Sequence, residues 1–182
     1  MRKLLKLFAW AVLLTALAVI LRSAFDKAIH FIYPLKYEDS INEAAEEYGL
    51  DRYFVMAVIK AESNYNPSAH SGVARGLMQI TAGTAEWIAE KMQIQFEEDD
   101  IENPDLNIKM GCYYLKHLLE RYNDETLALA AYNAGMGNVS EWLEDSECSG
   151  DNKSLDYIPF RETREYVKKV NKYYTVYKRL YK

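Results

Sequence analysis

A glutamate followed by a serine, Glu62-Ser63, lies where an apolar stretch of helical periodicity ends and a polar, glycine-bearing loop begins. Val58 and Ile59 precede the glutamate by about one turn, so we expect its carboxyl group at a helix end against apolar side chains. Burial among apolar groups disfavours the charged form of a carboxyl and raises its pKa. Because the loop side is open to a substrate, Glu62 is suited to act as a general acid.

A glutamate at a helix end is usually only solvated, so this assignment depends on the motifs that follow. They are residues 76–81 (Gly-Leu-Met-Gln-Ile-Thr), 131–135 (Ala-Tyr-Asn-Ala-Gly) and 158–167 (Ile-Pro-Phe-Arg-Glu-Thr-Arg-Glu-Tyr-Val). In this order, the motifs resemble those of lytic transglycosylases of the soluble-lytic-transglycosylase (SLT) type. These enzymes belong to the lysozyme-like superfamily, which cuts peptidoglycan. The resemblance extends from about Tyr37 to about Tyr177.

The resemblance implies a mainly α, lysozyme-like (SLT or goose-type) single globular domain of about seven to eight helices. It also implies an activity: cleavage of the β-1,4 bond between N-acetylmuramic acid and N-acetylglucosamine, leaving 1,6-anhydromuramoyl ends. Glu62 would be the single acid and base of this reaction. Neither a cofactor nor a metal ion is implied.

Six further positions match residues that line the family's cleft, and we expect them to bind substrate. These are Ser71, Gln79, Tyr132, Asn133, Glu162 and Tyr166. Ordinary structural roles remain open for them: Ser71 could be a turn residue, Asn133 a helix cap, Glu162 a surface glutamate and Tyr166 a core tyrosine. Glu162 and Tyr166 are one helical turn apart and can share a face.

A second catalytic carboxylate is not evident near the acid. A retaining glycosidase ordinarily uses one as a nucleophile about 5 Å away, whereas substrate-assisted families use the N-acetyl oxygen of the sugar instead. The segment 62–81 contains no acid besides Glu62. We therefore give Glu162 a binding role and not that of a nucleophile.

Three alternative functions remain. A hydrolytic muramidase of the same fold would use the same acid, and the mass of its product would identify it. A wall-binding module without catalysis is disfavoured by the intact Glu62 and cleft motifs. A wall-opening component of a secretion or conjugation machine would be an enzyme with a dedicated partner, and gene neighbourhood would test that.

The N-terminal residues differ in composition from the rest. Residues 7–21 are apolar except for Thr15 and follow a basic leader. As a helix they span roughly 22 Å, less than the ~30 Å hydrocarbon core, so length fits a signal-peptide core as well as an anchor. A cleavage site is poor because Arg22 occupies a position where a small residue is favoured. We expect residues 1–30 to be an uncleaved, single-pass signal-anchor with a short link in the bacterial cytoplasmic membrane. Residues 31–182 would then form the catalytic domain on the cell-wall side.

Helices that position the site can be predicted from apolar periodicity and capping residues. We expect them at 38–48, from Asp51 to about 62, from Thr81 or Thr84 to about 92, at 104–122, from Asp124 to about 134, around 139–143, and over the C-terminal stretch that includes 167–181. The acidic run 97–100 and the polar run 149–156 are expected to be solvated loops. No alternating strand of useful length is present.

The charge of the chain indicates which classes of binding partner to expect. The whole chain has a net charge of −5, and the basic N-terminal segment leaves the remainder near −9. Such a balance argues against nucleic acid, which requires a basic face. We expect a monomer whose partners are peptidoglycan glycan strands and, through the N-terminal helix, the membrane. Cys112 and Cys148 are expected to be free thiols, because Cys112 lies on an apolar helical stripe.

Overall fold

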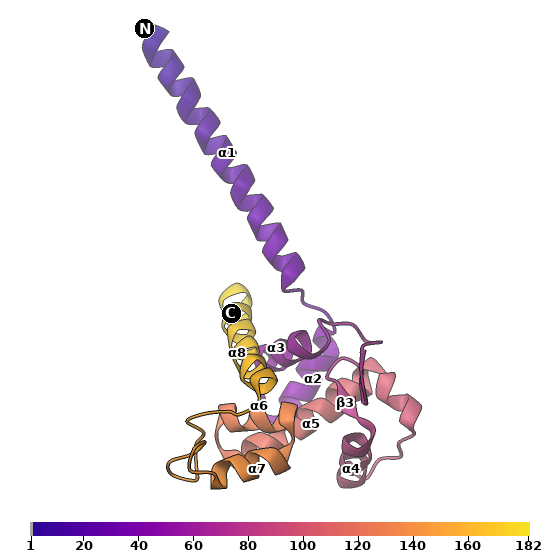
Figure 1. Ribbon diagram of the computed structural model, residues 1–182. Coiled ribbons are helices and arrows are strands. Elements are labelled where there is room, and N and C mark those ends of the chain that lie inside the picture. Colours follow the sequence, from indigo (N-terminus) through magenta and orange to yellow (C-terminus); the bar gives the residue numbers. More distant parts are fainter. Residues whose placement is uncertain (1) are drawn as a thin grey trace. The chain divides into compact units, whose positions relative to one another are not determined.

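The computed structural model describes residues 2–182, with all their side chains except that of Leu4. This part of the chain divides into two compact units, residues up to Lys36 and Tyr37–Lys182. The division lies in the link after the first helix, near the boundary that the sequence predicts after residue 30. The second unit holds, within the described residues, seven α-helices and one 3₁₀-helix (Figure 1), which confirms the mainly α fold.

The first unit consists mainly of helix α1, Arg2–Ile32. Its stretch Leu5–Ile32 has a mean hydropathy of 2.0 and is long and apolar enough to cross a membrane. Large apolar side chains along it are exposed, among them Leu13, Val19 and Phe25. The helix is thus a candidate membrane span, although an N-terminal signal sequence has the same properties.

Two helices begin the second unit. Helix α2, Glu38–Tyr48, ends at Gly49, whose left-handed φ of 67° suits a residue without a Cβ. The side chain of Asp51 then caps helix α3, Arg52–Glu62, as the sequence predicts. Every residue from Phe54 to Ala61 is buried, so α3 is a central helix of the domain and carries Glu62 at its end.

A small antiparallel sheet follows in the order β1-β2-β3. Its strands, β1 (His70–Ser71), β2 (Ala74–Arg75) and β3 (Ile80–Thr81), have two residues each, too few for an alternating pattern to be visible in the sequence. Thr81 caps helix α4, Ala82–Met92, which decides between the two predicted starts.

The acidic run after α4 differs from its prediction. Its residues are solvent-exposed as expected, but the backbone forms a 3₁₀-helix, η1, Glu98–Glu102. A reciprocal capping box between Glu97 and Asp100 starts it, and Ile101 is fully buried beneath it. The capping geometry and one buried apolar residue are enough to order a short helix that lacks apolar periodicity.

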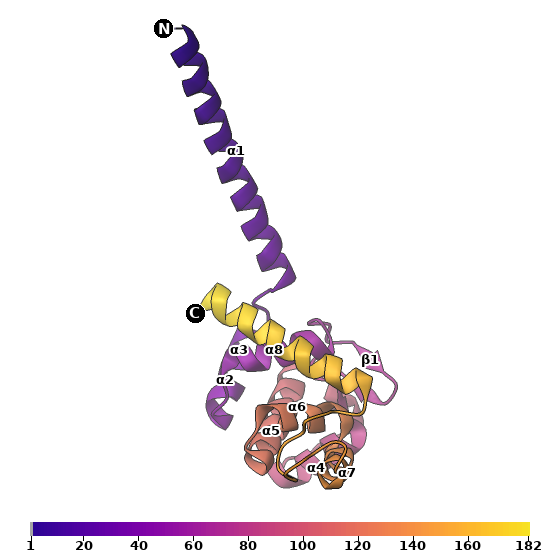
Figure 2. The same cartoon turned by 60° about the vertical axis from the view of Figure 1, so that its left-hand side comes forward.

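Four further α-helices complete the core. They are α5 (Pro104–Tyr122), α6 (Glu125–Ala134), α7 (Met136–Glu144) and α8 (Arg161–Tyr181). Asn103 caps the first of these helices, and Asp124 caps the second, as predicted. Helix α8 packs against α3 and α6, and Figures 1 and 2 show it lying beside both. This packing brings the C-terminal motif 158–167 to the end of α3. The predicted thiols are confirmed: Cys112 and Cys148 are both free and buried.

Candidate active site

Glu62 is the last residue of α3, and the chain turns sharply after it. Asn64 and Tyr65 adopt left-handed conformations with φ of 50° and 63°. For a bulky tyrosine this conformation is costly and persists only where surrounding contacts impose it. Tyr65 is buried, and its hydroxyl donates a hydrogen bond to the Met56 carbonyl at 3.3 Å. Tyr65 is therefore part of the core that shapes this turn.

The Glu62 carboxyl is half-buried, and this burial raises its pKa from 4.5 to about 7. The negative charge of Glu162 adds to the increase, whereas contacts with Tyr166 and Lys169 oppose it. A carboxyl with a pKa near 7 is protonated in a large fraction of molecules at neutral pH and can still release its proton. These are the properties of a general acid and base.

Two tyrosines from different helices lie close to this carboxyl. Burial, together with the charge of Glu62, raises the pKa of Tyr132 on α6 and of Tyr166 on α8 well above 10, so both phenols stay protonated. The Tyr132 hydroxyl donates a hydrogen bond to the Met78 carbonyl at 2.8 Å. The Tyr166 hydroxyl is buried without a hydrogen-bond partner of ordinary geometry. It nevertheless faces the Glu62 carboxyl, and this contact lowers the pKa of Glu62, as expected of a phenol that can donate to the carboxylate.

Ser71 and Gln79 are brought together in the small sheet. The Ser71 hydroxyl donates a hydrogen bond to Oε1 of Gln79 at 2.6 Å. Nε2 of Gln79 donates to the carbonyls of Ala69 and Gly76, both at 2.8 Å. Both amide hydrogens of Gln79 are thus used within the loop, and its left-handed backbone (φ 49°) turns the chain into β3. These contacts give both residues a role in shaping the loop.

Asn107 on α5 is a key residue that sequence reasoning missed. Its side chain is fully buried, accepts a hydrogen bond from Met78 N–H at 2.7 Å and donates to the carbonyls of Arg75 and Ile101 at 3.1 and 2.8 Å. A Cβ on Gly76 would lie 2.4 Å from the Asn107 amide nitrogen, and the φ of Gly76 is +80°. Glycine is therefore required where the loop meets α5.

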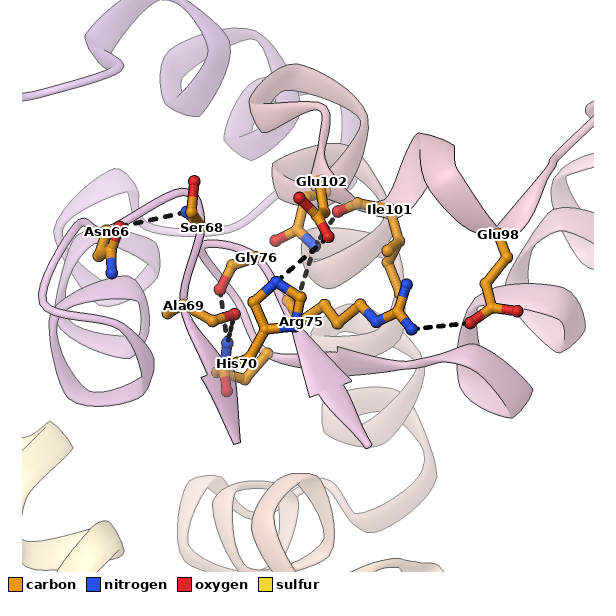
Figure 3. A network of polar contacts seen from close by, with 11 residues as sticks. Asn66, Ser68, Ala69, His70, Arg75, Gly76, Glu98, Ile101 and Glu102 are labelled. Atoms are coloured by element: carbon orange, nitrogen blue, oxygen red, sulfur yellow. Dashed lines mark hydrogen bonds and ion pairs between the residues drawn. The ribbon is translucent and has the colours of Figure 1, made fainter. Parts of the chain in front are cut away.

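Two ion pairs attach the same loop to η1 (Figure 3). His70 Nε2 lies 3.2 Å from Glu102, and Arg75 lies 3.0 Å from Glu98. The second pair holds the Arg75 guanidinium against the first residue of η1. Both pairs are solvent-exposed, so each contributes little to stability.

The other two predicted residues lie where α6 meets α8. Oδ1 of Asn133 accepts a hydrogen bond from the hydroxyl of buried Thr163 at 2.8 Å, which joins the two helices. Arg164 secures the preceding turn, donating to the carbonyls of Ile158 and Pro159. Glu162, in the first turn of α8, is exposed and close enough for its charge to raise the pKa of Glu62.

A cavity of about 260 Å³ adjoins this arrangement. It is lined by Gln79, Ile80, Thr81, Thr84, Tyr114, Tyr132, Asn133, Ala134 and Gly135. A second hollow of about 300 Å³ shares Thr81, Thr84 and Tyr114 with it and continues to Trp87 and Met136. Together they form a groove with amide, hydroxyl and aromatic groups along its walls, a composition suited to sugars.

A larger cavity, of about 570 Å³, lies between α2, α5 and η1, away from the predicted residues. Half of its lining residues are acidic, and Ser40 donates a hydrogen bond to Asp105 there. Within residues 2–182, no group of three or more His, Cys, Asp or Glu side chains has a geometry that could hold a metal ion. Size alone is therefore a poor guide to the site here; the perturbed carboxyl and the convergent polar groups lie beside the smaller cavity.

The structure thus brings most of the predicted residues together in two adjacent groups. Tyr132, Glu162 and Tyr166 surround the Glu62 carboxyl, while Gln79 and Asn133 line the groove. Ser71 lies in the exposed hairpin and reaches the groove only through its bond to Gln79. Lys169, which lowers the pKa of Glu62, was not identified from the sequence. Its position one helical turn after Tyr166 could have indicated that it lies on the same face of α8.

Comparisons with known proteins agree with this arrangement. The family model for the transglycosylase SLT domain matches residues 39–155, more than half of the chain. The soluble lytic murein transglycosylase of Salmonella typhimurium is 36% identical over 80% of this chain and 23% of its own length. The membrane-bound lytic murein transglycosylase F of Desulfosudis oleivorans is 33% identical over 78% of this chain and 32% of its own.

A solved structure of similar fold is an inactive Glu-to-Gln mutant of the lytic transglycosylase Slt from Pseudomonas aeruginosa. Its TM-score is 0.73 at 32% identity, over 84% of this chain and 25% of that one. The chain therefore spans about a quarter to a third of the length of these similar proteins. The match over residues 39–155 includes the acid, the hairpin and the Tyr-Asn motif, so the chain belongs to the transglycosylase SLT domain family.

Proposed function

We propose that this protein is a peptidoglycan lytic transglycosylase that uses Glu62 as its single acid and base. The observation that carries the proposal is the position of Glu62: a half-buried carboxyl at the end of a core helix, with a pKa of about 7, beside a polar groove. Membership of the SLT family supports it. The substrate is the β-1,4 bond between N-acetylmuramic acid and N-acetylglucosamine in glycan strands.

The reaction uses the same carboxyl twice. Protonated Glu62 donates its proton to the glycosidic oxygen as the bond to C1 of the muramoyl sugar breaks. The resulting carboxylate then accepts the proton of the muramoyl C6 hydroxyl, whose oxygen bonds to C1. The proton balance closes within one cycle and no water is consumed, so the product carries a 1,6-anhydro end and Glu62 is again protonated.

Positive charge that develops at C1 requires stabilisation between these two steps. The N-acetyl oxygen of the same sugar can supply it, as in glycosidases that act with substrate assistance. Glu162 is exposed, and its charge raises the pKa of Glu62 less than burial does. We therefore assign Glu162 a role in orienting glycan and not that of a nucleophile. Tyr166, whose hydroxyl faces the Glu62 carboxyl, is placed to donate a hydrogen bond to the carboxylate during the reaction.

Product mass provides the decisive test. The full chain, solubilised in detergent, is incubated with purified peptidoglycan, and the released muropeptides are analysed by mass spectrometry. Anhydromuramoyl products, lighter by one water than reducing ends, support the proposal. Reducing ends would instead assign the same site to a hydrolytic muramidase.

We also propose that α1 anchors the protein in the bacterial cytoplasmic membrane as a single span. The basic residues Arg2, Lys3 and Lys6 would remain on the cytoplasmic side, which would put the SLT domain on the cell-wall side. The length and apolar surface of α1 support this, as does the similarity to a transglycosylase whose name describes it as membrane-bound.

A further inference from the structure

The last turn of α3 is held by a lysine from α8. Nζ of Lys169 donates a hydrogen bond to the carbonyl of Ala61 at 2.6 Å, across a sequence separation of 108 residues. Ala61 directly precedes Glu62. The final carbonyls of a helix have no partners within the helix, and those of Ile59 and Lys60 are satisfied by the backbone N–H groups that follow. Lys169 supplies the partner for the next carbonyl.

The same ammonium is also an electrostatic partner of the acid. A carboxylate at this place is disfavoured twice, by burial and by the negative end of the α3 dipole. Lys169 acts in the opposite direction and lowers the pKa of Glu62. The pKa of Lys60 is lowered mainly by burial and, to a smaller extent, by the charge of Lys169. Both cations therefore lie near the end of α3.

Other charged or titratable groups around Glu62 come from two helices. Helix α8 contributes Glu162, which raises the pKa of Glu62, and Tyr166, which lowers it. Helix α6 contributes Tyr132, whose phenol stays protonated. Among these groups, Lys169 is the cation that lowers the pKa of Glu62, and the exposed carboxylate of Glu162 acts against it.

We propose that Lys169 is a positioning residue of this site: it fixes the last turn of α3 through Ala61 and stabilises the Glu62 carboxylate after the proton has left. The inference rests on the proposed function, in which Glu62 alternates between its two protonation states in every cycle. Burial alone favours the acid form. A nearby cation that does not donate to the carboxyl directly offsets part of that preference, so the carboxylate can form when the glycosidic bond breaks.

The test is the pH profile of kcat/KM for peptidoglycan solubilisation by the full chain in detergent, measured between about pH 5 and pH 9. Lys169→Met removes the charge and the donor, so the basic limb should move to higher pH by about half a unit or more, since a screened charge near a half-buried group has an effect of this order. Lys169→Arg keeps the charge and should restore most of the wild-type profile. Lys168→Met is the matched control, because Lys168 is exposed and pairs only with nearby Glu165 at 3.3 Å among the contacts described.

A structural role alone would predict a different result, namely loss of activity by the same factor at every pH with no movement of the limb. That result, or a wild-type profile in Lys169→Met, would overturn the inference. If Lys169→Met does not fold by circular dichroism, Lys169→Gln, which keeps a donor for Ala61 without the charge, should show the same upward movement. Failure of the proposed function is recognised separately, because Glu62→Gln would then remain active or the wild-type products would carry reducing ends.

Discussion

The Asn107 side-chain oxygen accepts a hydrogen bond from the backbone N–H of Met78 at 2.7 Å, between residues 29 positions apart. Through this bond, helix α5 holds the loop whose next residue is Gln79. The Met78 carbonyl in turn accepts the Tyr132 hydroxyl at 2.8 Å. One buried amide therefore ties the position of the groove wall to that of α6, although Asn107 does not line the groove itself.

Asn107→Ala should destabilise the domain strongly. It removes the side-chain partner of backbone groups on Met78, Arg75 and Ile101, two of these bonds being buried, and opens a small cavity. The expected cost is about 3 kcal/mol or more in the free energy of unfolding. Chemical denaturation of the full chain in detergent measures it. Asn171→Ala, at an exposed position of α8, is the control and should change stability by less than about 1 kcal/mol; similar losses in the two variants would contradict the role of Asn107.

Glu62→Gln should abolish most of the activity without unfolding the protein. The amide preserves the volume and hydrogen-bonding shape but cannot donate a proton as a carboxylic acid does. We expect the turnover rate to fall at least ~10²-fold. Wall-clearing rate and circular dichroism test this, with exposed Glu86→Gln on α4 as the control. An active Glu62→Gln would refute the mechanism.

The raised pKa of Glu62 also predicts a pH dependence of stability. The folded state holds this proton up to about pH 7, whereas the unfolded chain releases it near pH 4.5. The carboxyl therefore contributes no penalty below pH 4.5, and stability is lost progressively as pH rises through 7. The loss is at most about 3 kcal/mol, and less because the group is partly exposed. Glu62→Gln should thus be more stable than the parent at pH 8.5 and not at pH 4; equal differences at both values would argue against the shift.

Glu162→Gln distinguishes a glycan-orienting residue from a nucleophile. If Glu162 only orients glycan, the amide retains most hydrogen bonding, and the loss should be far smaller than in Glu62→Gln, with the product still anhydro. A nucleophile would be as essential as the acid. Initial rates on purified glycan strands, with product masses, measure this, and Glu165→Gln on the same exposed side of α8 is the control. Equal and near-complete loss of activity in Glu62→Gln and Glu162→Gln would reject the single-acid mechanism.

The anchor predicts the behaviour of the protein in cells. A full-length protein should sediment with membranes and be degraded by protease added outside intact protoplasts. Replacing Leu13 and Leu17 by Arg should release it from membranes, because a charge in the hydrocarbon core is costly. N-terminal sequencing that begins near Ala24 or Phe25 would instead show that α1 is a cleaved signal sequence.

Local features of this chain were readable from the sequence because they depend on neighbouring residues. Gly49, Asp51 and Asn103 mark helix ends through their own backbone and side-chain chemistry, and the position of Glu62 at a helix end follows from the apolar periodicity before it. Apolar periodicity did not reveal η1, because it has a single buried apolar residue, Ile101, and its order also depends on packing against α4 and α5.

Only the tertiary structure decided which polar groups are used in holding the site and which remain for a substrate. Gln79 is a good sugar-binding residue by type, yet both its amide hydrogens are bonded to backbone carbonyls. The contacts of Asn107 with Met78 and of Lys169 with Ala61 join residues 29 and 108 positions apart. Such pairings depend on how helices pack, and helix periodicity specifies the buried face without specifying its partner.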